Sequence, residues 1–193
     1  AKALTTRHDL SFGISEAIRN VIDKSSIKPK DISLVSLSTT LATNALVEDQ
    51  GGRVALIFVG FRDGDLAKHS INDALRGDPV LQTKGGHNHA GDETCRINLE
   101  EIKEWILKRD GVSAFAVASQ FATRNAAHEL QIMELIRNLT DKPVTASHQL
   151  SSKLNGPRRA LTAVLNARLI GIIDELIGLS LIHISEPTRL ASI

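Results

Sequence analysis

Residues 53–59 have the sequence Arg-Val-Ala-Leu-Ile-Phe-Val, and this stretch decides the fold class of the chain. After the arginine every position is apolar, so the stretch lacks the alternation of a strand that keeps one face in water. A continuously apolar strand is buried on both faces, as in a parallel sheet that is covered by helices on each side. The stretch therefore predicts a central strand of a parallel sheet.

Helical and strand patterns alternate on both sides of this strand. Apolar residues at three- and four-residue steps predict a helix over residues 11–24. Similar patterns predict helices over residues 41–48, 65–75, 99–108, 125–139 and 157–177, and strands over residues 32–37, 114–118 and 143–146. This order predicts an α/β fold with a mainly parallel sheet and flanking helices.

The composition excludes several classes of protein. The 193 residues are 42% hydrophobic and 23% charged, which is typical of one large or two small globular domains. Lysine and arginine number 23 against 22 aspartates and glutamates, so no electrostatic basis exists for binding nucleic acid or an anionic membrane. The single cysteine, Cys95, agrees with a reducing compartment, and we expect a cytoplasmic protein.

The segment from Ser38 to Leu46 predicts a tight turn between a strand and a helix. Free backbone N–H groups and a partial positive charge at a helix N-terminus suit a phosphate or another anion. The candidate contacts to a phosphate or a polar substrate are Thr39, Thr40, Thr43 and Asn44. Alternatively, the threonines cap the following helix and bind no ligand.

Two charged residues, Arg62 and Asp63, directly follow the predicted central strand. Ligands of open α/β sheets gather at the carboxyl ends of strands, so both residues are candidates for contact with a substrate or a phosphate. A surface ion pair or a turn-stabilising aspartate is the alternative interpretation.

Regular patterns fade between residues 60 and 98, which indicates a functional loop or an inserted element and a possible domain boundary there. On an extended segment, His87 and His89 would point to the same face, and Asp92 or Glu93 could add a carboxylate. His87, His89 and Asp92 are therefore candidate metal ligands. The alternative is an exposed polar loop without a metal.

Three polar residues, Arg159, Thr162 and Asn166, fall at positions i, i+3 and i+7 of the last predicted helix. This spacing predicts that they share one helix face. The face could bind a substrate or form a hydrogen-bonded network between helices in the core.

A series of short motifs runs through the chain. Residues 39–46 have the sequence Thr-Thr-Leu-Ala-Thr-Asn-Ala-Leu, residues 53–57 Arg-Val-Ala-Leu-Ile, residues 60–63 Gly-Phe-Arg-Asp, residues 85–87 Gly-Gly-His and residues 115–119 Phe-Ala-Val-Ala-Ser. Arg124-Asn125 and His128-Glu129 follow, and residues 159–167 have the sequence Arg-Ala-Leu-Thr-Ala-Val-Leu-Asn-Ala. In this order the motifs resemble the N-terminal region of the hydantoinase/oxoprolinase family, to about Gly178.

The resemblance implies an actin-like or sugar-kinase-like (ribonuclease H-like) ATPase fold. It also implies an A-type subunit that uses ATP and Mg²⁺, acts on a cyclic amide, and works with a B-type hydantoinase subunit or a fused domain. In the implied hydrolase reaction, ATP phosphorylates the amide carbonyl oxygen and so converts it into a good leaving group. An acetone-carboxylase-like subunit or other phosphotransferase, and a non-catalytic assembly module, remain alternatives.

The sequence departs from the family pattern in two places. Ser38 stands where the family has glycine, and an Asp-x-Gly-Gly-Thr-x-Thr-Asp hairpin, which grips phosphate and metal in the family, is missing from the sequence. Residues 180–189 also resemble a translated sequencing adapter. We therefore expect a metagenomic fragment with a family region over residues 1–178, a non-native tail over residues 179–193, and little or no ATPase activity of its own.

Overall fold

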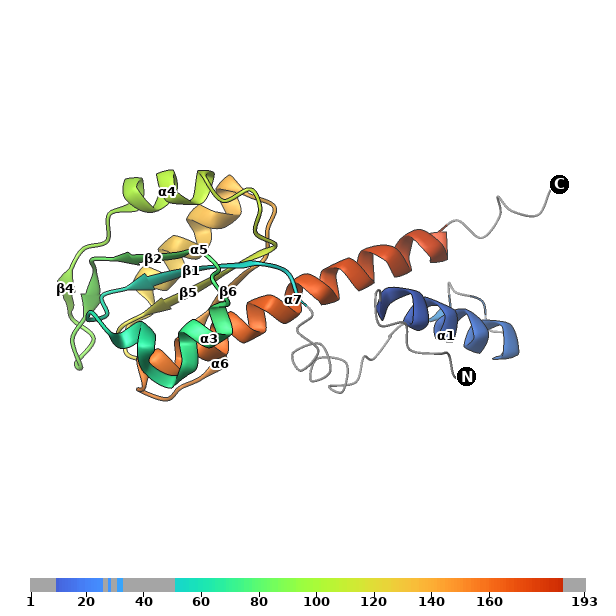
Figure 1. The fold of residues 1–193 in the computed structure, drawn as a ribbon, viewed down its shortest axis with the longest axis horizontal. Helices are drawn as coiled ribbons and strands as arrows, with labels where there is room; N and C mark the ends of the chain where they lie inside the picture. The colour runs from blue at the N-terminus through green and yellow to red at the C-terminus, as the bar shows by residue number, and fades with distance from the viewer. Residues whose placement is uncertain (1–9, 26–27, 29–30, 33–50, 186–193) are drawn as a thin grey trace. The chain divides into compact units, whose positions relative to one another are not determined.

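The computed structural model describes residues 10–25, 28, 31–32 and 51–185 (Figure 1). The chain forms two compact units, one from residues 1–44 and 172–193 and the other from residues 45–171. In the first unit, helix α1 (Leu10–Ser25) confirms the helix predicted over residues 11–24. The strand predicted over residues 32–37, apart from Ile32, and the helix predicted over residues 41–48 lie outside the described residues.

A parallel sheet forms the centre of the second unit. Its strands lie in the order β2 (Val80–Thr83), β1 (Val54–Val59), β5 (Ala114–Ser119) and β6 (Val144–Ala146). The two central strands, β1 and β5, pair from Val54 opposite Ala114 to Val59 opposite Ser119, and both are buried at every position. The prediction from residues 53–59 is therefore confirmed, since β1 is a central strand that is buried on both faces.

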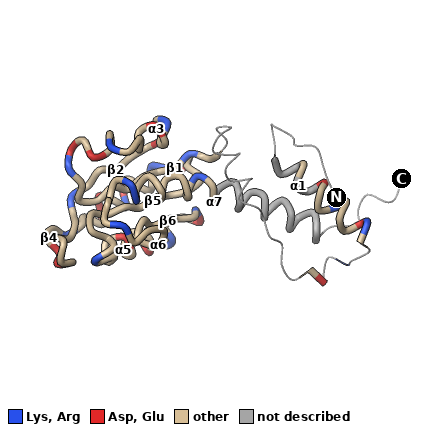
Figure 2. Tube along the Cα trace, turned by 90° about the horizontal axis from the view of Figure 1, so that it is seen from below, with Lys and Arg blue, Asp and Glu red and all other residues tan. Residues whose placement is uncertain are grey.

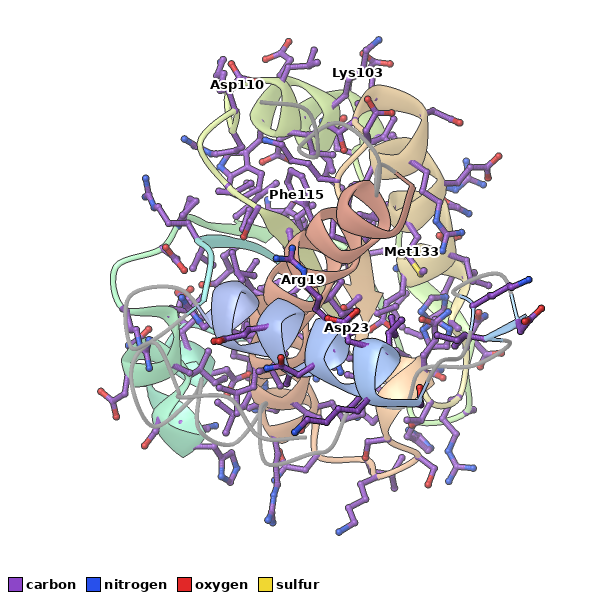
Figure 3. All side chains as sticks on the ribbon, turned by 90° about the vertical axis from the view of Figure 1, so that its right-hand side faces the viewer. Arg19, Asp23, Lys103, Asp110, Phe115 and Met133 are labelled. Atoms are coloured by element: carbon purple, nitrogen blue, oxygen red, sulfur yellow. The ribbon has the colours of Figure 1, made fainter. Side chains whose placement is uncertain are left out.

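Helices cover both faces of this sheet (Figure 1). Helices α4 (Leu99–Leu107) and α5 (Ala127–Leu139) pack on the face that includes Ile57 and Phe115. Helices α3 (Ile71–Leu75) and α7 (Gly156–Ser185) pack on the face that includes Phe58. In Figure 3 the Phe115 side chain lies inside this layered structure, whereas Lys103 and Asp110 lie at its outer edge.

Residues 60–98 contain more regular structure than the sequence predicts. The helix expected over residues 65–75 is split into the 3-10 helix η2 (Asp65–Ser70) and α3, because Lys68 and His69 have non-helical backbone angles. Strand β2 and the antiparallel pair β3 (Gly86–His87) and β4 (Glu93–Cys95) follow. The two units divide at residues 44 and 171, and residues 60–98 lie inside the second unit.

A buried ion pair joins β1, α3 and α7. Asp78 Oδ2 lies 2.7 Å from Arg168 Nη2 and accepts a hydrogen bond from the Val54 backbone N–H. The same guanidinium group donates to the carbonyl oxygens of Gly52 and Ala74. These contacts fix where β1 begins relative to the helices on one face of the sheet.

Charged residues of both signs are interspersed along the described trace of the second unit (Figure 2). None of the helices in the described part of the chain combines the length and the apolar character that crossing a membrane requires.

Candidate functional site

The carboxyl ends of the parallel strands bring several loops together at one edge of the sheet. Residues 60–63 follow β1, residues 84–86 follow β2, and residues 120–121 follow β5. The short helix α6 (Ser147–Leu150) follows β6 directly. Ligands bind outside this edge in open parallel sheets, so the edge is the candidate functional site.

A pocket of about 250 Å³, called here the first pocket, lies at this edge. Its apolar lining comes from Phe61, Phe121, Leu154 and Pro157. Its polar lining comes from Asp65, Lys68, His69, Gln120 and Asn155. The pocket therefore combines apolar walls with a few hydrogen-bonding groups, as small-molecule sites do.

Most polar groups of the first pocket already have partners. Lys68 Nζ lies 2.6 Å from Asp65 Oδ1, and the other carboxylate oxygen of Asp65 accepts the Arg62 backbone N–H. The hydrogen bond from Lys68 lowers the pKa of Asp65 and keeps its carboxylate charged. The Asn155 side-chain amide donates to His69 Nε2 at 3.1 Å, and its oxygen accepts the Arg158 N–H at the start of α7. These bonds fix the polar rim of the pocket.

A second pocket of about 560 Å³ lies at the same edge, and its lining includes Gly60, Asp63, Thr83, Lys84 and Cys95. Phe61 lines both pockets, and its ring stacks on Phe58 with 3.7 Å between the ring centroids. A residue that follows β1 thus contributes to both pockets and packs against the core.

A buried polar network, called here the Glu129 network, joins the ends of β5 and β6. Glu129 is fully buried and accepts hydrogen bonds from the Ser119 backbone N–H at 2.7 Å and from Ser147 Oγ at 2.6 Å. Its second oxygen accepts from the His148 backbone N–H and from His148 Nδ1, the latter at 2.6 Å. One carboxylate thus satisfies donors from β5, from α6 and from the histidine ring.

Arg159 extends this network toward the first pocket. Its guanidinium group donates to Ser147 Oγ, to the Ser119 carbonyl at 3.0 Å and to the Lys153 carbonyl at 2.8 Å. Burial lowers the pKa of Arg159, and the Glu129 carboxylate opposes that shift. Ser119 and Lys153 directly precede Gln120 and Leu154, so the network positions two walls of the first pocket.

Two histidine rings pack together beside the Gly85–Gly86 turn. The rings of His87 and His128 have centroids 4.2 Å apart, and both side chains are buried. His128 Nδ1 accepts the Gly86 backbone N–H, so the ring proton lies on Nε2 and is donated to Glu93 at 2.9 Å. This hydrogen bond lowers the pKa of Glu93. Burial, and then the neighbouring His128, lowers the pKa of His87.

We expect the stability of the second unit to fall in weak acid because of His87. Its pKa in the folded chain lies below the ordinary value of 6.5, so the unfolded chain binds the proton more readily. The stabilising contribution is complete above about pH 6.5 and is lost as the pH falls toward the folded pKa, by up to about 1.4 kcal/mol per pH unit. Urea unfolding between about pH 5 and about pH 8, followed by the fluorescence of the single tryptophan, Trp105, measures this loss.

The matched variants are His87→Gln and His89→Gln. Since His89 is exposed and lies two residues away, its replacement is expected to keep the pH profile of the unmodified chain. The His87 variant is expected to have a flatter profile. An equally steep profile in both variants would show that another group causes the acid sensitivity.

The family to which this chain belongs follows from comparison with known proteins. The family model of the hydantoinase/oxoprolinase N-terminal region matches residues 1–140. The chain belongs to the hydantoinase/oxoprolinase family. The resemblance of the motif series is therefore confirmed.

The names of the relatives within this family specify different activities. The chain is 28% identical over 202 residues to the acetophenone carboxylase gamma subunit of Aromatoleum aromaticum, covering 88% of this chain and 28% of that protein. It is 25% identical over 202 residues to 5-oxoprolinase 1 of Arabidopsis thaliana, covering 83% of this chain and 16% of that protein. The chain thus spans less than a third of the length of either curated relative.

A solved structure shares the fold. The crystal structure of ATP-dependent caprolactamase from Pseudomonas jessenii aligns with a TM-score of 0.70 and 24% identity, covering 96% of this chain and 30% of that chain. The α/β architecture with a mainly parallel sheet is therefore found in a protein of the same family.

The structure describes only some of the residues that the sequence predicts to contact a phosphate or a substrate. The predicted phosphate contacts Thr39, Thr40, Thr43 and Asn44 lie outside the described residues and stay predictions. Arg62 and Asp63 lie at the carboxyl edge as predicted; both are exposed, and Asp63 lines the second pocket. Their contact with a ligand stays a prediction.

The helical stripe of Arg159, Thr162 and Asn166 does not form one cluster. Arg159 is buried in the Glu129 network, whereas Thr162 is exposed and donates to the Arg158 carbonyl of its own helix. Asn166 accepts a hydrogen bond from Thr145 of β6 at 3.3 Å. For Arg159, the structure thus agrees with a buried network rather than with a substrate-facing surface.

The described residues do not bring His87, His89 and Asp92 together. They contain no group of three or more histidine, cysteine, aspartate or glutamate side chains that could hold a metal ion. His87 packs on His128, His89 is exposed, and Asp92 accepts a hydrogen bond from Asn88. Strand β3 ends at His87, so the strand geometry that would place both histidines on one face does not continue to His89.

Sequence reasoning missed three residues that shape this edge, namely Gln120, Glu129 in its structural role, and Asn155. Gln120 and Asn155 line the first pocket, and Glu129 supports it through the buried network. The sequence does contain a signal for Gln120, because this polar residue directly follows the buried strand β5. The partners of Glu129 come from two other elements, β5 and α6, and carry no local signal.

Proposed function

We propose that this chain is part of an ATP-dependent enzyme that hydrolyses a cyclic amide of the hydantoin or 5-oxoproline type. The observation that carries this proposal is the family match over residues 1–140, which spans the predicted phosphate turn and the Gly60–Asp63 segment at the carboxyl edge. The names 5-oxoprolinase and ATP-dependent caprolactamase, borne by two of its relatives, each specify a cyclic amide. Phosphorylation of the carbonyl oxygen would make the resonance-stabilised amide open to attack by water.

The proposal includes an actin-like ATPase fold and places the phosphate contacts at Thr39, Thr40, Thr43 and Asn44. The first pocket does not fit a triphosphate or its Mg²⁺ ion, because its volume is only about 250 Å³ and its lysine is paired with Asp65. No group of three side chains that could hold a metal ion occurs among the described residues. The residues of the first pocket are therefore not part of the proposed phosphate site.

A partner subunit is part of the proposal. The relative in Aromatoleum aromaticum is named as the gamma subunit of its enzyme, which supports an assembly of several chains. We propose a B-type hydantoinase subunit or a fused domain as the counterpart of this chain.

A carboxylase subunit is the second candidate function. It is supported by the 28% identity to the acetophenone carboxylase gamma subunit, compared with 25% to 5-oxoprolinase 1. Such an enzyme would use ATP on a ketone instead of on a cyclic amide.

Release of phosphate from ATP by the full gene product, together with its partner subunit, distinguishes the two candidates. We expect release that depends on a cyclic amide such as hydantoin, 2-pyrrolidone or 5-oxoproline, and an ¹⁸O label in the amide carbonyl is expected to appear in the phosphate. Release that depends on acetophenone and bicarbonate would instead establish the carboxylase function. Unlabelled phosphate would contradict phosphorylation of the amide oxygen.

A further inference from the structure

The first pocket contains one side chain whose hydrogen-bonding groups the fold leaves unused. The Gln120 backbone N–H donates to the Val59 carbonyl at 3.0 Å, which fixes the residue at the end of β5. Its side chain lines the first pocket and is half-buried, yet its carboxamide makes no hydrogen bond within the described part of the chain. A glutamine side chain offers a carbonyl acceptor and an NH₂ donor, so this carboxamide is available to a ligand.

The charges of the first pocket are already balanced. Its lining includes one carboxylate, Asp65, and one ammonium group, Lys68, and these are 2.6 Å apart. The third titratable group, His69, accepts a hydrogen bond from Asn155 through Nε2. The lining residues therefore offer no unpaired cation to an anionic ligand. Binding an unpaired negative charge in a partly apolar site is unfavourable.

The small volume and the apolar walls of the first pocket suit a small ring. Its volume of about 250 Å³ lies below the range of roughly 300–1,000 Å³ that drug-sized ligands occupy. Phe61, Phe121 and Leu154 supply apolar surface for the methylene groups of such a ring. The position of the walls is set by the core, because Phe61 stacks on Phe58 and the Glu129 network holds the residues that precede Gln120 and Leu154.

The amide group of a small ring matches the free carboxamide of Gln120. Ring closure forces the amide into the cis arrangement, so that its N–H and C=O point to the same side. A glutamine side chain presents a carbonyl acceptor beside an NH₂ donor, and the two groups can therefore form a pair of hydrogen bonds. An open-chain trans amide cannot make both bonds at once.

We propose that the first pocket is a binding subsite for small, neutral cyclic amides, and that Gln120 is the specificity-determining residue that recognises the cis amide group. This inference rests on the proposed function and narrows its substrate class to neutral rings. Rings that carry a carboxylate are expected to bind to the first pocket with lower affinity.

Three ligands of nearly the same size test the proposal on the unmodified full gene product. They are 2-pyrrolidone, 5-oxoproline, which adds a carboxylate to the same ring, and N-methyl-2-pyrrolidone, which lacks the amide N–H. We expect 2-pyrrolidone to bind about 10-fold more tightly than either of the others, as measured by ligand-observed NMR titration without ATP. Equal or tighter binding of 5-oxoproline would overturn the preference for neutral rings.

The variant Gln120→Leu tests the proposed contact, and Gln131→Leu is its control. Leucine removes both hydrogen bonds, so the affinity for 2-pyrrolidone is expected to fall by about 10- to 100-fold and to equal that for N-methyl-2-pyrrolidone. Gln131 is exposed on α5, and its replacement is expected to leave both affinities unchanged. Unchanged binding by Gln120→Leu would overturn the role of Gln120.

The outcomes separate this inference from the proposed function. Binding of 2-pyrrolidone that depends on Gln120, without phosphate release from ATP, would support the subsite and contradict the hydrolase function. Phosphate release that depends on a cyclic amide but is insensitive to Gln120→Leu in its KM would support the hydrolase and overturn the subsite. The ligand series needs no variant, so it decides the inference even if Gln120→Leu fails to fold.

Discussion

Replacing Glu129 by alanine is expected to lower the free energy of unfolding of the second unit by about 3–5 kcal/mol. The substitution removes the acceptor of four hydrogen bonds, two from backbone N–H groups and two from the side chains of Ser147 and His148. It also leaves the buried guanidinium group of Arg159 without the carboxylate whose charge opposes its desolvation. Unsatisfied buried donors and an uncompensated buried charge are the most costly consequences of a single substitution.

Urea unfolding followed by Trp105 fluorescence measures this change, because Trp105 lies on α4 in the same unit. Glu134→Ala is the matched control, since Glu134 is an exposed glutamate on the same helix. It is expected to change stability by no more than about 0.5 kcal/mol. If both variants were equally stable, the Glu129 network would not be a main source of stability.

Gly60→Ala is expected to destabilise the second unit by about 2–5 kcal/mol and to deform both pockets. Gly60 has a φ of 74°, a left-handed conformation that is unfavourable for alanine. An added Cβ would also lie 2.4 Å from the Gly85 carbonyl oxygen and 3.1 Å from Gly86 Cα. Since these are backbone atoms, the Gly85–Gly86 turn would have to move rather than a flexible side chain.

Gly77→Ala separates the two contributions. Gly77 has a φ of 80°, and no heavy atom lies within 4 Å of the position of an added Cβ. Its replacement is therefore expected to cost only the left-handed conformation, about 1–2 kcal/mol. A loss of stability in Gly60→Ala no greater than in Gly77→Ala would show that the turn accommodates the methyl group without strain.

The elements of this fold could be predicted from the sequence where a pattern is local. The apolar residues 54–59 and 114–118 lie in buried central strands, and three-residue and four-residue steps give helices α1, α4 and α5 close to their predicted bounds. Strand β2 could not be predicted, because Val80–Thr83 is a short edge strand in which one residue of four is buried. Its pairing with Leu56–Val59, 24 residues away in the chain, is what makes it a strand.

The residues of the candidate site could likewise be predicted only where a pattern is local. The sequence placed Arg62 and Asp63 after a strand end, and the ordered motifs led to the hydantoinase/oxoprolinase family that the family match confirms. Helical spacing put Arg159, Thr162 and Asn166 on one face, but it could not show that Arg159 alone is buried. Extended spacing put His87 and His89 on one face, but it could not show that the strand ends at His87.

The sequence by itself determined the α/β class, the positions of the main strands and helices, and the family, because each of these depends on residues that are close together in the chain. Only the tertiary structure decided which polar side chains are buried partners and which are free to meet a ligand. Glu129 receives its hydrogen bonds from residues 10 to 19 positions away, whereas Gln120 keeps its carboxamide unpaired in the described part of the chain. Such differences arise from the packing of separate elements, which no local pattern of residues encodes.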